Sequence, residues 1–319
     1  MNTDIMNQKD ELRVKSDHHK NDSASKKDWL ILMAIIIAYF LFWQITLRIA
    51  VVNPVYQGCV SLVSLALTLT LTVWLARTLK NSLSAAISLG LSSFLTLPAI
   101  FIPMVLMSGA IPAAMIPTVG GVFQSYGKAF HALPGLQGLG LIWLAVSLGV
   151  LLSRIIREIK LLLPIAIVLA LVDLYVVFGG GLVTQANSGK SVIAQQAMKS
   201  LTVPLAPKIR TPKGVPPPQQ LAVGFADYLF TALFFACFLK FSIRSRETFF
   251  WLIGTLCGYL LIVEIFRVDL PALVPIAVVV IGRNYKLFHY EAQERRDLLI
   301  AGVIVLTLLG GLFFASRRH

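Results

Sequence analysis

The chain carries little charge and, above all, little negative charge. Asp, Glu, Lys and Arg make up 13% of its 319 residues, well below the roughly 25% of a soluble domain. Hydrophobic residues make up 57% and the mean hydropathy is +0.78. This composition excludes a soluble globular enzyme and a disordered chain. It also makes the net charge of +13 a poor indicator of nucleic-acid binding, so no nucleic-acid partner is expected.

The few acidic residues are unevenly placed. Of the 15 Asp and Glu, six lie in residues 1–28, where six basic residues balance them. This polar segment lacks the features of a signal peptide and is expected to be a disordered cytoplasmic tail. Any acid chemistry within a membrane must therefore use the nine acids of the remaining chain, which are Glu158, Asp173, Asp227, Glu247, Glu264, Asp269, Glu291, Glu294 and Asp297.

Several catalytic chemistries lack the residues that they need. The sequence contains no HExxH zinc motif, no GxSxG nucleophile motif and no Walker motif. The five histidines do not cluster at metal-ligand spacing. The three cysteines, Cys59, Cys237 and Cys257, stand singly in apolar segments. The simplest interpretation is that each acts as a small buried hydrophobic residue. We therefore expect neither a metal site nor a cofactor.

What the sequence has in abundance is long apolar runs. About 20 apolar residues cross a bilayer as a helix. Because these runs do not alternate polar and apolar residues, helices are favoured over a β-barrel. The predicted fold class is an all-α polytopic membrane protein of about nine transmembrane helices, at 29–51, 57–79, 84–107, 136–154, 159–178, 220–242, 248–266, 269–283 and 298–316.

The distribution of basic residues predicts an orientation. Basic loops favour the cytoplasm, and nine spans with a cytoplasmic N-terminus place most Lys and Arg inside. Segment 179–219 conflicts with this orientation, since it lies outside with five basic residues and no acid. Segment 109–135, rich in Gly and Pro, is either a re-entrant loop or a tenth span that reverses everything after it. The prediction is a multi-pass protein embedded in the lipid bilayer of a prokaryotic plasma membrane.

Two of the nine acids differ from the other seven. Asp173 and Asp227 lie in consecutive apolar segments, with no basic residue within five positions. An ionised Asp in mid-membrane costs about 2.5–3.5 kcal/mol on insertion scales, whereas the other acids lie beside basic residues or near helix ends. Either each Asp is protonated and hydrogen-bonds a neighbouring helix, or the two face each other across a water-filled site.

A facing pair of carboxyls has a specific chemical use. Two such groups cannot both ionise easily, so they share a proton, as in the aspartic-protease dyad. The ionised partner takes a proton from water while the protonated partner donates to a peptide carbonyl oxygen. Because such a pair titrates jointly, neither Asp is assigned a fixed role.

Around these aspartates the chain resembles the presenilin and signal peptide peptidase family of intramembrane aspartyl proteases. Asp173 is followed by Tyr175-Val-Val-Phe178, similar to the first aspartate motif of that family. Gly224-Phe-Ala-Asp227 resembles its GxGD motif, and Pro271-Ala272-Leu273 matches its PAL motif. The order of the motifs is also that of the family. The resemblance covers about residues 160–283, less than half of the chain.

The resemblance implies an intramembrane-cleaving aspartic endopeptidase that hydrolyses transmembrane helical substrates. It makes Asp173 and Asp227 the catalytic pair. It gives the PAL motif of Pro271, Ala272 and Leu273 a role in active-site geometry and substrate positioning, and Gly224 a role in close helix approach. It also divides the chain into the tail 1–28, N-terminal helices at 29–154, a catalytic core at 155–283 and an additional helix at 284–319.

Three positions depart from the family pattern. Val172 stands where the family usually has Tyr, Ala226 replaces the glycine before the second aspartate, and Val274 separates PAL from Pro275. The Ala226 methyl group puts activity or substrate preference in question. Two alternatives therefore stay open: a transporter that couples protons or cations to the two aspartates, and a catalytically inactive presenilin-like scaffold.

Two further patterns predict contacts. Leu201–Leu205 is a short β-prone run and a candidate strand for pairing with an extended substrate, and Pro204 limits it to a sheet edge. Gly254 and Gly258 have the GxxxG spacing typical of helix packing, either within the chain or between chains. The sequence does not choose between these two, so it predicts no oligomeric state.

Overall fold

The computed structural model describes residues 27–46, 54–79, 84–94, 96, 135–178, 201–206, 222–243, 245–266 and 270–316. Within these ranges the chain is mostly helical. Five helices are long and apolar enough to cross a membrane: Lys27–Thr46, Tyr56–Thr78, Leu136–Ser153, Ile159–Phe178 and Ser245–Val263. The protein is thus an all-α membrane protein in its main architecture, to which the described residues add one two-stranded sheet.

Each of the nine predicted segments contains a helix in the described part of the chain. Besides Lys27–Thr46 and Ser84–Phe94, these are α2 (Pro54–Thr78), α5 (Leu136–Ser153), α6 (Leu162–Phe178), α9 (Phe225–Lys240), α10 (Ser245–Phe266), α11 (Leu273–Asn284) and α12 (Ala292–Ser316). Short 3-10 turns lead into α6 and follow α11, at Ile159–Leu161 and Tyr285–Leu287. The proposed re-entrant segment 109–135 lies, except for its last residue, outside the described residues.

The predicted span 220–242 is wrong at its start. Residues Ala222–Gly224 form a strand, β2, and α9 begins only at Phe225. β2 pairs antiparallel with β1 (Thr202–Pro204), so the predicted strand in this region is confirmed and its observed partner is β2. This pairing joins segments about 20 residues apart in the sequence, and a local hydropathy pattern cannot predict such a contact. Consequently Asp227 lies in the first turn of α9 and not in the middle of a helix.

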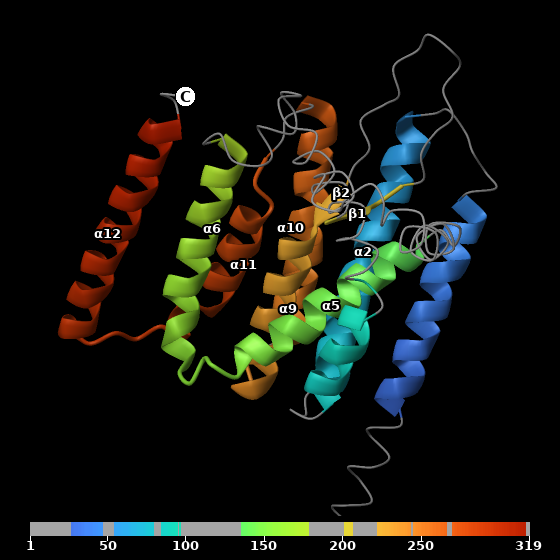
Figure 1. Ribbon diagram of the computed structural model, residues 1–319, viewed down its shortest axis with the longest axis horizontal. Coiled ribbons are helices and arrows are strands. Elements are labelled where there is room, and N and C mark those ends of the chain that lie inside the picture. The colour runs from blue at the N-terminus through green and yellow to red at the C-terminus, as the bar shows by residue number, and fades with distance from the viewer. Residues whose placement is uncertain are drawn as a thin grey trace, which may run out of the picture.

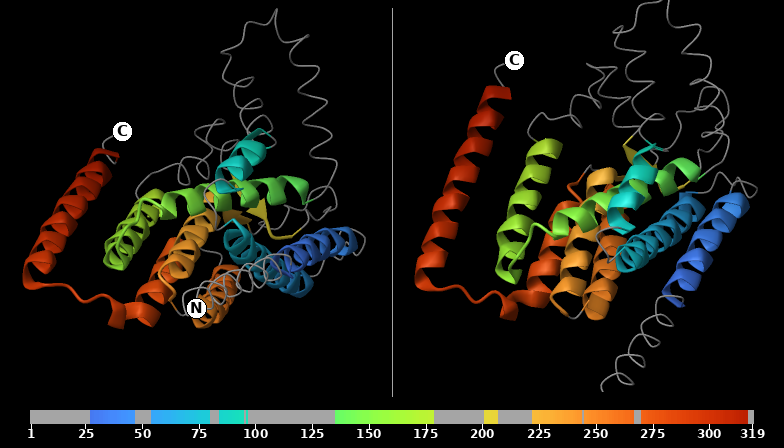
Figure 2. Two further views of the ribbon diagram at one scale, coloured as in Figure 1. Left: turned by 90° about the horizontal axis from the view of Figure 1, so that it is seen from below. Right: turned by 60° about the horizontal axis from the view of Figure 1, so that its bottom comes forward.

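The helices of the C-terminal half stand side by side. Figure 1 shows α12 at one edge of the molecule, then α6, then α11, then α9 and α10, and α2 beyond them. α5 crosses this group obliquely and packs mainly on α9, and Figure 2 shows the same crossing from two other directions. The packing of α11 against α6 and of α9 against α5 and α2 fixes where the two aspartate-bearing helices lie.

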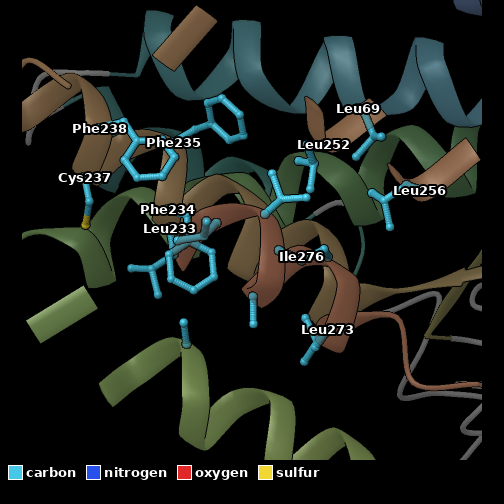
Figure 3. Packing of buried hydrophobic residues seen from close by; sticks show 14 of the residues in the cluster. Leu69, Leu233, Phe234, Phe235, Cys237, Phe238, Leu252, Leu256, Leu273 and Ile276 are labelled. Atoms are coloured by element: carbon cyan, nitrogen blue, oxygen red, sulfur yellow. The ribbon is translucent and has the colours of Figure 1, made fainter. Parts of the chain in front are cut away.

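α9 is the centre of the hydrophobic core. Its residues Phe234, Phe235 and Phe238 are at most 2% exposed and pack with leucines of α2 and α10 and with the first turns of α11 (Figure 3). The opposite side of α9, which includes Ala232, packs with α5 and with the second half of α2. α9 is therefore covered on both sides, as expected for a helix that is apolar around its whole circumference.

Glycines in two helices have different packing roles. A Cβ added to Gly149 of α5 would lie 2.5 Å from the carbonyl oxygen of Leu229 in α9. The two backbones therefore lie closer together than a side chain at this position would allow. In contrast, a Cβ added to Gly254 or Gly258 of α10 meets no described atom within 4 Å. Of the two alternatives left open by the sequence, the described residues give no support to packing within the chain, and packing between chains stays a prediction.

Substitution of the two kinds of glycine should have opposite effects. Gly149→Ala should destabilise the protein by about 1–3 kcal/mol, because the methyl group forces α5 and α9 apart. The matched variant Gly254→Ala should be neutral or stabilising by up to about 1 kcal/mol, since alanine is the better helix former. Thermal unfolding of the purified protein in detergent checks both, and equal midpoints for the two variants would contradict the packing described here.

α12 is attached to α6 near the start of both helices. The Lys160 ammonium donates to the two carboxylate oxygens of Glu294 at 2.8 and 3.0 Å, and the Tyr290 hydroxyl donates to the carbonyl oxygen of Lys160. Hydrogen bonds from Lys160 and from the Glu291 N–H hold the pKa of the partly exposed Glu294 carboxyl below its usual range. Most of the remaining α12 surface is exposed.

This attachment should weaken in acid. Because the pKa of Glu294 is lower in the folded protein, its contribution is complete above the ordinary Glu pKa of about 4.3 and is lost as the pH falls through the folded value. Amide hydrogen exchange near residues 288–296, corrected for the intrinsic pH dependence, should speed up in that acid range. In the variant Glu294→Gln these amides should exchange faster already at pH 7, with little further change in acid. An unchanged wild-type profile would show that the Lys160–Glu294 pair does not hold α12 against α6.

Candidate active site

Asp227 is held by the backbone that immediately precedes its helix. The Gly224 N–H donates to Oδ2 of Asp227 at 3.0 Å, which closes the first turn of α9. A Cβ added to Gly224 would lie 3.3 Å from this same oxygen, and the only described atoms within 4 Å of it belong to the Asp227 carboxyl. The missing side chain of Gly224 therefore leaves space for the Asp227 carboxyl, whereas the resemblance to the family implied space for the close approach of a helix.

The small sheet orients this turn. The Phe225 N–H donates to the Leu201 carbonyl oxygen at 2.8 Å, and antiparallel ladders alternate with a period of two. It follows that Val223 bonds toward β1, whereas the polar backbone groups of Ala222 and Gly224 point to the opposite edge of β2. The Gly224 N–H on that edge reaches Asp227. The outer edge of β2 and the Asp227 carboxyl thus lie on the same side of the sheet.

Asp173 is held by the backbone of the PAL motif. α6 packs along α11, and the Leu273 N–H at the first residue of α11 donates to Oδ2 of Asp173 at 2.8 Å. Pro271 and Leu273 are buried, which fixes the backbone that carries this donor. The two motifs recognised 100 residues apart in the sequence are therefore joined by a direct hydrogen bond.

Both carboxyls accept a backbone N–H where a helix begins. The free N–H groups and the dipole of a helix N-terminus favour a negative charge. Asp227 occupies this position on α9 and Asp173 on α11. α11 contacts both α6 and α9, and so brings the two aspartate-bearing helices together at its start. Both residues are half-buried.

The PAL motif bonds Asp173 and also lines a cavity beside Asp227. Ala272, next to the donor Leu273, lines a cavity of about 30 Å³ that Asp227 also lines. Its other walls come from α2, α9, α10 and α11, together with Val223 of β2: Leu65, Leu69, Val223, Tyr228, Thr231, Leu256, Tyr259, Leu260 and Ile276. The Tyr259 hydroxyl donates to the carbonyl oxygen of Leu270, just before Pro271, and so fixes the entry to the motif.

The remaining predicted site residues differ in how they are placed relative to the two carboxyls. Ala226 is exposed, so its methyl group is not packed against the described fold. Tyr175 is half-buried on α6, two residues after Asp173, and therefore lies about 200° around the helix from it. The structure does not bring Tyr175 together with the carboxyls. Pro275 lies in the first turn of α11, where proline is tolerated.

Sequence reasoning missed three groups of residues around the site. The Leu273 backbone donor and the Tyr259 hydroxyl had no recognisable signal, because neither contact follows from a residue pattern. A row of hydroxyl-bearing residues on α2 did have one, since its members recur every three or four positions. Among the described residues, no three His, Cys, Asp or Glu side chains are placed to hold a metal ion.

Comparison with known proteins identifies no relative. No family model, no curated protein and no solved structure matches this chain.

Proposed function

We propose that the protein is an intramembrane aspartyl protease of the presenilin and signal peptide peptidase type. The observation that carries this proposal is the convergence of three sequence motifs on one pair of carboxyls. Asp173 accepts the N–H of Leu273 from PAL, and Asp227 accepts the N–H of Gly224 from the GxGD-like motif. A structural pair of protonated aspartates would need hydrogen-bond partners, but not partners supplied by these particular motifs.

In the proposed reaction the two carboxyls share the work of activating water. The ionised Asp takes a proton from water, whose oxygen attacks the carbonyl carbon of a substrate peptide bond, while the protonated Asp donates its proton to the carbonyl oxygen. The tetrahedral intermediate then collapses, the amide nitrogen gains a proton from the pair and the C–N bond breaks. The two backbone donors hold the carboxyls in place through both steps.

The substrate in this proposal is a transmembrane helix that unwinds locally. The edge of β2 that bears Ala222 and Gly224 is the better place for an extended substrate to pair, because it lies beside Asp227. β1, which the sequence suggested for this role, already pairs with β2, and its outer edge includes Pro204, which has no N–H. Strand addition would replace the hydrogen bonds that the substrate loses on unwinding.

Removal of either carboxyl should abolish cleavage. Asp173→Asn and Asp227→Asn keep the shape of the side chain but cannot pass a proton, so each should lower peptide-bond hydrolysis at least about 10³-fold. The assay is cleavage of a helical membrane peptide by purified protein in lipid, analysed by mass spectrometry. A hydroxyl-containing analogue of the tetrahedral intermediate should inhibit the wild type.

The control is Asp297→Asn, which removes an exposed carboxyl near the start of α12 and should leave cleavage unchanged. Cleavage by both active-site variants would exclude the mechanism. A wild type that cleaves no peptide but accumulates a solute in vesicles, in a manner dependent on both aspartates, would instead establish the transporter. A wild type that does neither would leave the inactive scaffold.

Ala226 should affect substrate choice more than folding. Because its methyl group is exposed beside Asp227, Ala226→Gly should change the thermal midpoint only by the cost of a glycine in a helix, up to about 1 kcal/mol. The variant should cleave peptides with a bulky residue next to the scissile bond faster than the wild type does. Equal relative rates over a peptide series with graded side chains would show that the methyl group does not face the substrate.

A further inference from the structure

The cavity beside Asp227 has hydrocarbon walls. Most of them are aliphatic side chains of α2, α10, the start of α11 and β2: Leu65, Leu69, Val223, Leu256, Leu260, Ala272 and Ile276. The Tyr228 and Tyr259 hydroxyls, although their rings line the cavity, are bonded elsewhere in the protein, and Oγ1 of Thr231 is fully buried. Because an apolar cavity stays dry, the group that fills this one is expected to be apolar.

The cavity is small. A space of roughly 10–15 Å³ holds one water-sized group, and a methyl group is of similar size. The volume of about 30 Å³ therefore has room for about two carbon groups. An empty space of this size costs its walls dispersion contacts, so a small aliphatic group that entered it would bind favourably.

Val223 connects the cavity to the small sheet. It pairs with Val203 of β1, and residues directly opposite each other have their side chains on the same face of a sheet. Val203 packs on α5, where its Cγ1 would lie 3.0 Å from a Cβ added to Gly138. Val223 packs against the buried residues of both core clusters and also lines the cavity. The face of the sheet that bears the two valines is thus the face toward the helices and the cavity.

A strand that pairs with the outer edge of β2 would direct one side chain to this cavity. In an antiparallel strand, the residue opposite Val223 has its side chain on the same face, with the two Cβ atoms about 4.5–5.5 Å apart. Its two neighbours point to the other face, and the next residues on the same face lie about 7 Å further along. Since Val223 directly precedes the Gly224 donor to Asp227, this one residue also lies close to the candidate catalytic carboxyl.

We propose that the cavity is a substrate subsite that accepts one small aliphatic side chain, of the size of alanine or valine, from the residue paired with Val223. The subsite rests on the proposed function and specifies its substrate class: transmembrane segments with a small apolar residue at one fixed position near the scissile bond. Leucine and aromatic side chains exceed the space and would have to displace Leu256 or Ile276. A polar side chain would lose its hydrogen bonds to water without a replacement.

Cleavage of a peptide series tests the size limit. Each peptide is a helical membrane segment in which one of the roughly six residues nearest the scissile bond is Gly, Ala, Val, Leu or Phe. Because one methylene in a hydrophobic pocket changes a rate by about 10–200-fold, we expect one position at which kcat/KM falls at least about tenfold from Val to Leu. Mass spectrometry shows that the same bond is cut. Equal rates for Val and Leu at every position would overturn the subsite.

Variants of the cavity should move this limit in opposite directions. Leu256→Ala enlarges the cavity and should raise the rate with Leu at that position to at least the rate with Val. Val223→Ile fills it and should lower the rate with Val at least about tenfold below that with Ala. Val223→Ile adds only one methylene, so it tests the subsite even if the alanine variant does not fold.

The matched control is Leu252→Ala. It removes the same buried side chain from α10 one turn earlier, at a residue that does not line the cavity (Figure 3). It should leave the size preference as in the wild type. The same preference in Leu256→Ala, Val223→Ile and the wild type, or an equal change in Leu252→Ala and Leu256→Ala, would overturn the subsite.

Peptide binding separates the subsite from the protease. Asp173→Asn, which is inactive under the proposed function, should bind the uncut peptides in lipid nanodiscs with a Kd at least about fivefold higher for Leu than for Val at one position. This limit in binding, together with a wild type that cleaves nothing, would support the subsite and contradict the protease. Cleavage without any size limit would do the reverse. Binding of no peptide in the series would overturn the subsite.

Discussion

Two backbone N–H groups, each where a helix begins, are the contacts on which the candidate site depends. A carboxylate within a membrane is costly unless protein groups replace its water. Here the Leu273 N–H supports Asp173 and the Gly224 N–H supports Asp227. Each donor is in place only because the surrounding elements hold it: α11 must begin beside α6, and β2 must end where α9 starts. The position of helix ends thus matters more to this site than the helices themselves.

The rest of the fold fixes those helix ends. α9 is covered by α5 on one side and by α2, α10 and α11 on the other, so its first turn cannot shift. At its far end, the Lys240 ammonium donates to the carbonyl oxygen of Ile156, just after α5, at 2.6 Å. β1 packs on α5 through Val203, which a Cβ on Gly138 would approach to 3.0 Å. α9 therefore bears Asp227, follows directly on β2 and forms the centre of the core.

Hydrolysis inside a membrane has to bring together a peptide bond and water, which the bilayer separates. In the proposed mechanism an extended substrate reaches Asp227 along the outer edge of β2, whose backbone groups would pair with it. Irregular backbone at membrane depth is tolerated only where protein or water lines it. The Asp227 carboxyl lies at the end of this edge, where the Gly224 N–H holds it.

The sequence by itself determined the helical membrane class and singled out Asp173 and Asp227, because hydropathy is local and charge in an apolar run is conspicuous. It also placed the PAL residues at the start of a helix. Only the tertiary structure decided that Asp227 lies in a first turn, since the β1–β2 pairing spans about 20 residues. The same holds for the bond between Leu273 and Asp173, and for the open surroundings of Gly254. Backbone donors and helix contacts depend on which elements meet, and residue patterns along one segment do not contain that information.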